Sequence, residues 1–435
     1  MRKLAVAVVL TALAACLQAS AQTPAPAAED GKLLEQAAYQ MPAFEEIGGW
    51  YKQQLTREAY DRIRNSTDLE LLKIRYASDG LRVAGFIYKP RQTEGRKFPV
   101  VIYNRGGLGP GSEIGPENFY YVYEMHRLAT EGFVVLASQY RGYDGAGGRD
   151  EAGGADTHDV MNIVKLARTL PYADTSRMFM WGYSRGAIMT LQAIRDGVPL
   201  RAAAVVGAPT DYFEFARQRG EAFFLRAFPD YEKNKEELLT NRSAMRWVEK
   251  INVPILFLHG GADPSIPPSQ VHRLAEKLEE RGVVYEMVVY AKDVHPVALN
   301  LEDRVNRTVR WFKNPPTPSV AQALRKVVEA EGVAAAVRRY RELKKTAAAD
   351  YDFSEPELNT LGYELLGAGR ASDAVEIFKL NVEMFPDAFN TYDSLGEAYL
   401  AAGERELAIQ NYRRSLELNP QNTNAAAALK RVGQK

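Results

Sequence analysis

Short apolar segments alternate with longer segments of helical spacing along residues 67–313 of the chain. Runs such as FPVVIYN, FVVLASQ and VPILFLHG are each followed by a polar turn and an amphipathic stretch. Apolar strands that alternate with helices form parallel sheets that are covered on both faces. The sequence therefore predicts an α/β fold, doubly wound around a mostly parallel sheet of about eight strands. Asp79-Gly80 predicts a hairpin turn between the first two strands.

Residues 211–248 interrupt this alternation between two predicted strands. The segment is rich in aromatic residues, namely Tyr212, Phe213, Phe215, Phe223, Phe224, Phe228, Tyr231 and Trp247. One interpretation is a group of extra helices with a small core of its own. The other is a cap over a pocket, because an insertion beyond the carboxyl end of a strand lies where α/β proteins bind ligands. The two interpretations are compatible.

A proline-rich segment, residues 314–319, separates this region from an alanine-rich helical one at residues 320–435. Two stretches there repeat at a spacing of 34 residues. Leu361, Gly362, Ala374, Phe378 and Pro386 correspond to Leu395, Gly396, Ala408, Tyr412 and Pro420. The repeat resembles the tetratricopeptide repeat, in which small and aromatic positions let two antiparallel helices pack closely. The resemblance implies an all-α repeat domain that binds a protein partner, or one that only packs against the preceding domain.

The N-terminus has the pattern of an export signal. Met1-Arg2-Lys3 precedes the apolar run LAVAVVLTALAA, and Ala19-Ser20-Ala21 offers a cleavage site, which predicts a signal peptide over residues 1–21. Alternatively, Leu13-Ala14-Ala15-Cys16 resembles a lipobox, so that residues 1–15 are removed and Cys16 carries a lipid anchor. Both interpretations predict a bacterial envelope protein, either periplasmic or lipid-anchored. We expect residues 22–66 to form a helical lead-in to the first strand.

The charge balance excludes several classes of function. The chain of 435 residues has 55 basic and 55 acidic side chains, so nothing in its net charge predicts binding to nucleic acid. The only long apolar run lies at the N-terminus, so no membrane-spanning helix is expected after processing. Cys16 is the only cysteine, which rules out an intramolecular disulfide. We expect neither a cofactor nor a metal ion.

A serine lies between two glycines in GYSRG, residues 182–186, where a strand pattern gives way to a helical one. Either this turn simply needs small residues, or Ser184 is a nucleophile held on a tight elbow. A nucleophilic serine needs a histidine as base and an acid that orients the histidine. On a sheet of this kind the three follow the order serine, acid, histidine, each beyond the carboxyl end of a strand.

His295 and Asp263 fit this order. His295 follows the last predicted strand directly and is the predicted base, whereas Asp263 follows the preceding strand and is the predicted acid. A turn aspartate is the other interpretation of Asp263, because Asp-Pro favours turns. Asp293 is a rival acid that we expect to be solvated. The other histidines are expected in helices (His126, His158 and His272) or bonded to their own loop (His259).

The predicted reaction also needs donors for an oxyanion. One is expected to be the backbone N–H that follows the nucleophile, here that of Arg185. The second is expected in the loop YNRGGLG, which contains Asn104, Arg105, Gly106 and Gly107. Glycines there let the backbone approach a substrate closely, although a simple turn would also explain them.

These motifs together resemble the catalytic domain of the prolyl oligopeptidase family over residues 70–313. The resemblance rests on VVIYNRGG, SQYRGYDGAGGRDEAGGADTHDV, GYSRG, PILFLHGGADPSIPPSQ and VVYAKDVH, in the family's order. It implies the α/β-hydrolase fold and assigns the nucleophile, acid and base to Ser184, Asp263 and His295. Arg185 stands where the family usually has tyrosine, and Asn104 or Arg105 replaces a tyrosine that often donates to the oxyanion.

Residues 22–66 are too few for the β-propeller that many members of that family carry. We therefore expect an exported serine hydrolase that acts on a peptide or an ester through an acyl-enzyme. A peptidase of prolyl oligopeptidase type is the first interpretation and a carboxylesterase the second. A catalytically silent binding protein with a helical interaction domain is the alternative from another class.

Overall fold

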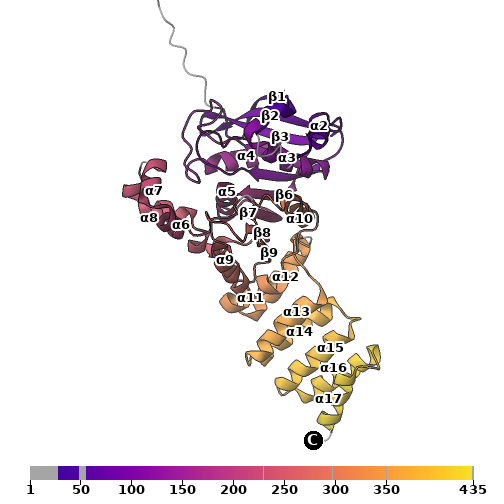
Figure 1. The fold of residues 1–435 in the computed structure, drawn as a ribbon. Helices are drawn as coiled ribbons and strands as arrows, with labels where there is room; N and C mark the ends of the chain where they lie inside the picture. Colours follow the sequence, from indigo (N-terminus) through magenta and orange to yellow (C-terminus); the bar gives the residue numbers. More distant parts are fainter. Residues whose placement is uncertain (1–27, 49–54, 229, 296, 349, 434–435) are drawn as a thin grey trace, which may run out of the picture.

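A computed structural model describes residues 28–48, 55–228, 230–295, 297–348 and 350–433. Nine strands form one sheet in the order β1-β2-β3-β5-β4-β6-β7-β8-β9 (Figure 1). They are β1 (Leu33–Ala38), β2 (Leu69–Ser78), β3 (Leu81–Pro90), β4 (Phe98–Asn104), β5 (Val134–Ser138), β6 (Ala173–Tyr183), β7 (Ala202–Val206), β8 (Ile255–Gly260) and β9 (Tyr285–Tyr290). Pairing from β5 through β4 to β9 is parallel, and the first three strands are antiparallel. The predicted fold class is confirmed.

Helices cover both faces of the sheet, as its apolar strands require. Helices α3 (Phe119–Thr130) and α10 (Leu301–Lys313) pack on one face. Helices α4 (Thr157–Thr169), α5 (Arg185–Arg195) and α9 (Ser269–Glu280) pack on the other. Successive residues of β4 point to opposite faces, so alternate positions of this strand enter different cores.

The expected helical lead-in over residues 22–66 is wrong at residues 33–38, which form a strand. Leu33–Ala38 forms β1, which pairs with β2 along the edge of the sheet and brings the number of strands to nine. Leucine, alanine and glutamine favour a helix, but the open edge of β2 offers unpaired backbone groups that outweigh this weak preference. Two short helices follow, η1 (Phe44–Glu46) and α2 (Arg57–Arg64). The predicted signal segment and Cys16 lie outside the described residues.

The interrupting segment forms three helices between β7 and β8. They are α6 (Tyr212–Arg219), α7 (Glu221–Ala227) and α8 (Tyr231–Arg242), and Figure 1 shows them projecting from the side of the sheet near α5. Two 3-10 turns, η3 (Ala244–Arg246) and η4 (Val248–Lys250), lead into β8, and a third, η2 (Pro116–Asn118), precedes α3. Several aromatic rings of the segment 211–248 form a cluster around Phe224, which is completely buried. These helices therefore have a small core of their own.

The C-terminal region is a row of helices that extends away from the sheet (Figure 1). Its members are α11 (Val320–Glu331), α12 (Val333–Thr346), α13 (Glu355–Gly367), α14 (Ala371–Met384), α15 (Phe389–Ala401), α16 (Arg405–Leu418) and α17 (Thr423–Gly433). The pair α13–α14 recurs as α15–α16, because both starting positions move by 34 residues (389 − 355 and 405 − 371). Their apolar side chains form a separate core. In the part of the chain that is described, no helix is long and apolar enough to cross a membrane.

Candidate active site

Ser184 lies on a sharp turn between β6 and α5. Its backbone has φ of 52° and ψ of −114°, a conformation that residues other than glycine rarely adopt. A residue held this way costs about 1–3 kcal/mol, and such strain concentrates at functional sites. The neighbouring glycines are required by space, because a Cβ at Gly182 would collide with the Gly186 carbonyl and one at Gly186 with the Asn104 carbonyl. The turn therefore holds the Ser184 side chain at the carboxyl edge of the sheet.

Ser184, His295 and Asp263 form one chain of hydrogen bonds. His295 Nε2 lies 2.7 Å from Ser184 Oγ, and His295 Nδ1 lies 2.6 Å from Asp263 Oδ2. The three residues come from loops that follow β6, β8 and β9, so the parallel sheet brings the distant sequence positions to one edge. With Nδ1 protonated toward the carboxylate, Nε2 accepts a hydrogen bond from the serine hydroxyl. The structure thus brings together all three side chains that the sequence singled out.

Asp263 is held as an anion. Burial raises the pKa of its carboxyl, but the hydrogen bond and the charge of His295 outweigh burial and hold this pKa below its usual range. Asp263 Oδ1 also accepts the backbone N–H groups of Ser265 and Ile266, at 2.8 and 3.0 Å. Three donors therefore fix the carboxylate and leave it able to stabilise a cation on His295.

The rival acid Asp293 is buried, which corrects the expectation that it is solvated. Its two oxygens accept the backbone N–H of Leu299 and the side-chain amide of Asn300, at 2.8 and 2.6 Å. The carboxylate thereby braces the loop that carries His295. The burial of Asp293 could not be predicted from its position two residues before His295, because it arises from loop residues that fold back over Asp293.

The other histidines lie where the sequence placed them. His126, His158 and His272 are in α3, α4 and α9. His259 bonds its own loop, with Nε2 2.8 Å from the Ile266 carbonyl. Its Nε2 also lies 3.5 Å from Asp263 Oδ2, so His259 packs directly beside the acid.

The loop expected to supply the second oxyanion donor lies next to the elbow. The Asn104 amide donates to Thr190 Oγ1 at 2.9 Å, and the Arg105 guanidinium donates to the Gln139 carbonyl at 2.7 Å. Both side chains are buried, so only the backbone of this loop remains as a donor. Gly106 packs so tightly on Tyr183 that a Cβ would come within 2.6 Å of its ring.

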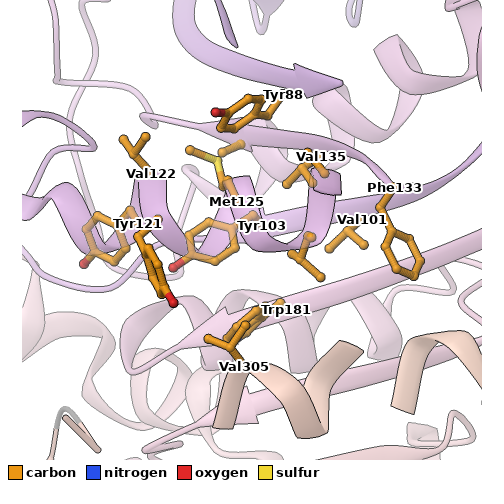
Figure 2. Packing of buried hydrophobic residues seen from close by; sticks show 14 of the residues in the cluster. Tyr88, Val101, Tyr103, Tyr121, Val122, Met125, Phe133, Val135, Trp181 and Val305 are labelled. Carbon is orange, nitrogen blue, oxygen red and sulfur yellow. The ribbon is translucent and has the colours of Figure 1, made fainter. Parts of the chain in front are cut away.

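Two features of the site were missed from the sequence. The first is Tyr121, which is buried with its ring 6.4 Å from that of Tyr183, the residue on which Gly106 packs, although its segment had shown only helical spacing. Figure 2 shows Tyr121 in the same buried cluster as Tyr103 and Trp181, with the Tyr103 ring in contact with both. The second feature is the buried side chain of Arg185, which bonds Asp150 and Asp156. The acidic, glycine-rich stretch GGRDEAGGAD was the only sequence signal for its partners.

The three side chains are arranged for one kind of chemistry. A serine hydroxyl bonded to a histidine, which is bonded to a buried carboxylate, can attack an electrophilic carbonyl carbon. Within the described ranges, no group of three or more histidine, cysteine, aspartate or glutamate residues is arranged to hold a metal ion.

Comparison with known proteins finds a family domain over the segment that contains Ser184, Asp263 and His295. A family model described as "Prolyl oligopeptidase family" matches residues 119–315. The uncharacterized peptidase YtmA of Bacillus subtilis is 28% identical over 253 residues, which are 57% of this chain and 95% of the relative. The uncharacterized peptidase YuxL of Bacillus subtilis is 27% identical over 61% of this chain and 42% of its own length.

A probable dipeptidyl-aminopeptidase B of Ajellomyces capsulatus is 26% identical over half of this chain and 24% of the relative. The chain therefore spans less than half of the length of two of these three relatives. Among solved structures, Pyrococcus horikoshii acylaminoacyl peptidase superposes with a TM-score of 0.48 at 20% identity, over 60% of this chain and 44% of that one. Porphyromonas gingivalis dipeptidyl peptidase 4 gives a TM-score of 0.49 at 19% identity, over 59% and 37%.

Proposed function

We propose that this serine hydrolase, which carries a prolyl oligopeptidase family domain at residues 119–315, is an exported serine peptidase that acts through an acyl-enzyme. One observation carries the proposal: an unbroken chain of short hydrogen bonds runs from the strained Ser184 through His295 to the buried Asp263. A purely structural turn would explain neither the strained backbone of Ser184 nor the histidine that is hydrogen-bonded to its hydroxyl.

In the proposed reaction His295 Nε2 takes the Ser184 hydroxyl proton while Oγ bonds to the substrate carbonyl carbon. Asp263 accepts the Nδ1–H and stabilises the imidazolium that forms. The tetrahedral intermediate then collapses, the C–N bond breaks, and His295 gives its proton to the leaving amine. Water then attacks the acyl-enzyme in the same way, with His295 as the base, and the carboxylic acid leaves and Ser184 is restored.

The oxyanion of the tetrahedral intermediate needs two fixed donors. We assign the first to the backbone N–H of Arg185, the residue that begins α5. We assign the second to a backbone N–H of the neighbouring loop, at Gly106 or Gly107. The side chains of Asn104 and Arg105 already have other partners, which supports a backbone donor over a side-chain donor.

Peptides are the favoured substrates because the relatives are named as peptidases. Apolar side chains beside the site, Leu108 at 39% exposure and Val294 at 47%, would contact an apolar substrate group. The N-terminal pattern supports export, followed by either a periplasmic or a lipid-anchored form. The 34-residue recurrence of the helix pairs supports a tetratricopeptide repeat that binds a protein partner.

A fluorophosphonate probe tests the proposal. Only an activated serine reacts with it, so the wild-type chain should be labelled and the Ser184→Ala variant should not. A panel of N-blocked peptides, free peptides and p-nitrophenyl esters then separates peptidase from esterase. Hydrolysis of esters alone would replace peptidase by carboxylesterase, and an unlabelled wild-type chain would leave only a binding role.

A further inference from the structure

Arg185 follows the nucleophile, and its side chain turns inward beneath the site. We infer that Arg185 is a positioning residue that locks the oxyanion loop, residues 105–112, against the nucleophile elbow. The inference rests on the proposed function, because it concerns the donors that the acyl transfer needs. One residue would then supply one oxyanion donor from its backbone and fix the other through its side chain.

A direct contact links the guanidinium to the loop. Arg185 Nη1 donates to the Gly107 carbonyl at 3.2 Å. This carbonyl belongs to one of the two glycines whose backbone N–H groups are candidates for the second donor. Gly107 has φ of 77° and is crowded by Ser112, so the loop turns sharply at the point where Arg185 holds it.

A second, indirect link reaches the far side of the same loop. Arg185 Nη1 donates to Asp150 Oδ2 at 2.8 Å, and the Tyr143 hydroxyl donates to the same carboxylate oxygen. The Tyr143 hydroxyl in turn accepts the backbone N–H of Gly109 at 2.8 Å. The loop is therefore tied to Arg185 at Gly107 and at Gly109, on both sides of the exposed Leu108.

The guanidinium itself cannot move easily. It is 5% exposed, lies 4.3 Å above the Tyr140 ring, and also bonds Asp156, which is completely buried. Burial opposes its charge, but the two carboxylates raise the pKa of Arg185 above its usual value. An arginine is needed here because its planar fork reaches two carboxylates and a carbonyl at once, whereas a lysine ammonium is a single point charge.

The test compares Arg185→Lys with a matched buried arginine elsewhere. Arg141 is 6% exposed and also binds two carboxylates, Asp79 and Asp159. Among the residues that the structure describes, its side-chain hydrogen bonds go to these two and not to the oxyanion loop. Arg141→Lys therefore controls for the loss of a buried charged network. In both variants the concentration of reactive serine is titrated with the fluorophosphonate. Rates are divided by this concentration, so unfolded protein does not affect the comparison.

For Arg185→Lys we expect kcat on a p-nitrophenyl ester to fall by about tenfold to a hundredfold, less than the ~10²–10³-fold cost of deleting an oxyanion donor. KM should change by less than about threefold, since substrate contacts stay in place. Phenylboronic acid bonds to the serine oxygen and places a boron-bound oxygen at the oxyanion position. Its inhibition constant should therefore rise by the same factor as kcat falls.

Tyr143→Phe removes the indirect link, together with the contacts of this hydroxyl to Ser112 and the Gly109 carbonyl, and leaves the guanidinium in place. It should lower kcat by a smaller factor. The inference is overturned if Arg185→Lys and Tyr143→Phe both keep the kcat and boronate affinity of Arg141→Lys. That result leaves the proposed function intact, because labelling of wild type and its loss in Ser184→Ala are scored separately. An unlabelled wild-type serine would instead reject the proposed function.

Discussion

His259 and His295 flank the same carboxylate, since His259 Nε2 lies 3.5 Å and His295 Nδ1 lies 2.6 Å from Asp263 Oδ2. The two histidines differ in environment. His259 is completely buried, and burial lowers its pKa against the opposing effects of the Ile266 carbonyl and Asp263. His259 is therefore neutral and fixes the turn that holds the acid, while His295 faces the serine.

The buried His259 makes stability depend on pH. Its folded pKa lies below the unfolded value of about 6.5, so the unfolded chain binds the extra proton and stability falls as pH drops below that value. His259→Gln keeps an N–H for the Ile266 carbonyl but does not titrate. The slope of unfolding free energy against pH should then decrease by up to about 1.4 kcal/mol per pH unit below pH ~6.5. Urea unfolding across this range measures the slope, and equal slopes in both proteins would contradict the prediction.

The three site residues should behave as one unit. Ser184→Ala should abolish hydrolysis while the fold is kept, and His295→Ala should cost nearly as much because the two act in the same step. Adding His295→Ala to Ser184→Ala should then cost little more. Asp263→Asn should lower kcat by about 10⁴-fold, since an amide favours the wrong tautomer of His295. Steady-state kinetics measures each effect, and near-wild-type turnover of His295→Ala would exclude it as the base.

The carboxylate of Asp263 also predicts acid sensitivity. Its pKa is below the usual value, so its contribution to stability is present above about pH 3.9 and is lost as pH falls further. Asp263→Asn lacks this ionisation. Its unfolding free energy should therefore fall less steeply than that of wild type below pH ~4. The same slope in both proteins would show that Asp263 is not stabilised in its charged form.

The sheet and the order of the site residues were predictable because both depend on local pattern. Apolar strands between helices force a parallel sheet, and a parallel sheet brings the ends of β6, β8 and β9 to one edge. The meeting of three residues that each follow a strand can therefore be predicted without any knowledge of packing. The strained turn at Ser184 was also readable, since glycines stand on both sides of it.

What failed to follow from the sequence depends on long-range contacts. Leu33–Ala38 became a strand only because the edge of β2 was open to it. Asp293 is buried by residues that follow it along the chain, and the Arg185 side chain found partners in a loop 35 residues before it. Burial of a polar side chain is set by what packs over it, which no residue spacing records.

The helices between β7 and β8 offer a matched pair of phenylalanines. Phe224 is completely buried, whereas Phe223 is only half-buried. Five aromatic rings surround Phe224, those of Tyr212, Phe215, Phe223, Phe228 and Tyr231. Phe224→Ala should destabilise these helices by about 3–5 kcal/mol and leave the ratio of bulky to acetyl ester hydrolysis unchanged. Phe223→Ala should lower that ratio if its ring lines the substrate pocket. An unchanged ratio in both variants would mean that the aromatic residues serve only the cap's core.

The helical row should be dispensable for chemistry on small substrates. Among the described residues, its apolar core contains none from the α/β domain. The contacts between the two include an ion pair between Arg201 and Asp350 at the surface. Deletion of residues 318–435 should leave kcat/KM on a small ester within about twofold of the full chain. Circular dichroism of the truncated protein verifies that it is folded. An insoluble or inactive truncation would instead make the row part of the catalytic unit.

The close packing of the helix pairs gives the last prediction. Gly362 of α13 faces Phe378 of α14, and a Cβ at Gly362 would lie 2.5 Å from that ring. Gly396 and Tyr412 repeat the arrangement in the next pair, at 2.9 Å.

An alanine in a helix normally gains about 0.5–1 kcal/mol over glycine, but overpacking costs about 1–3 kcal/mol. Gly362→Ala and Gly396→Ala should therefore destabilise the helical row, and Gly362→Ala should do so more. Gly367→Ala is the control, because no atom other than those of its neighbours and its own helix backbone lies within 4 Å of its Cβ position at the end of α13. Thermal unfolding followed by circular dichroism compares the three variants, while hydrolysis of small esters should stay constant in all of them. If Gly362→Ala were as stable as Gly367→Ala, the helices would have room to separate, and the glycine would not be what sets their distance.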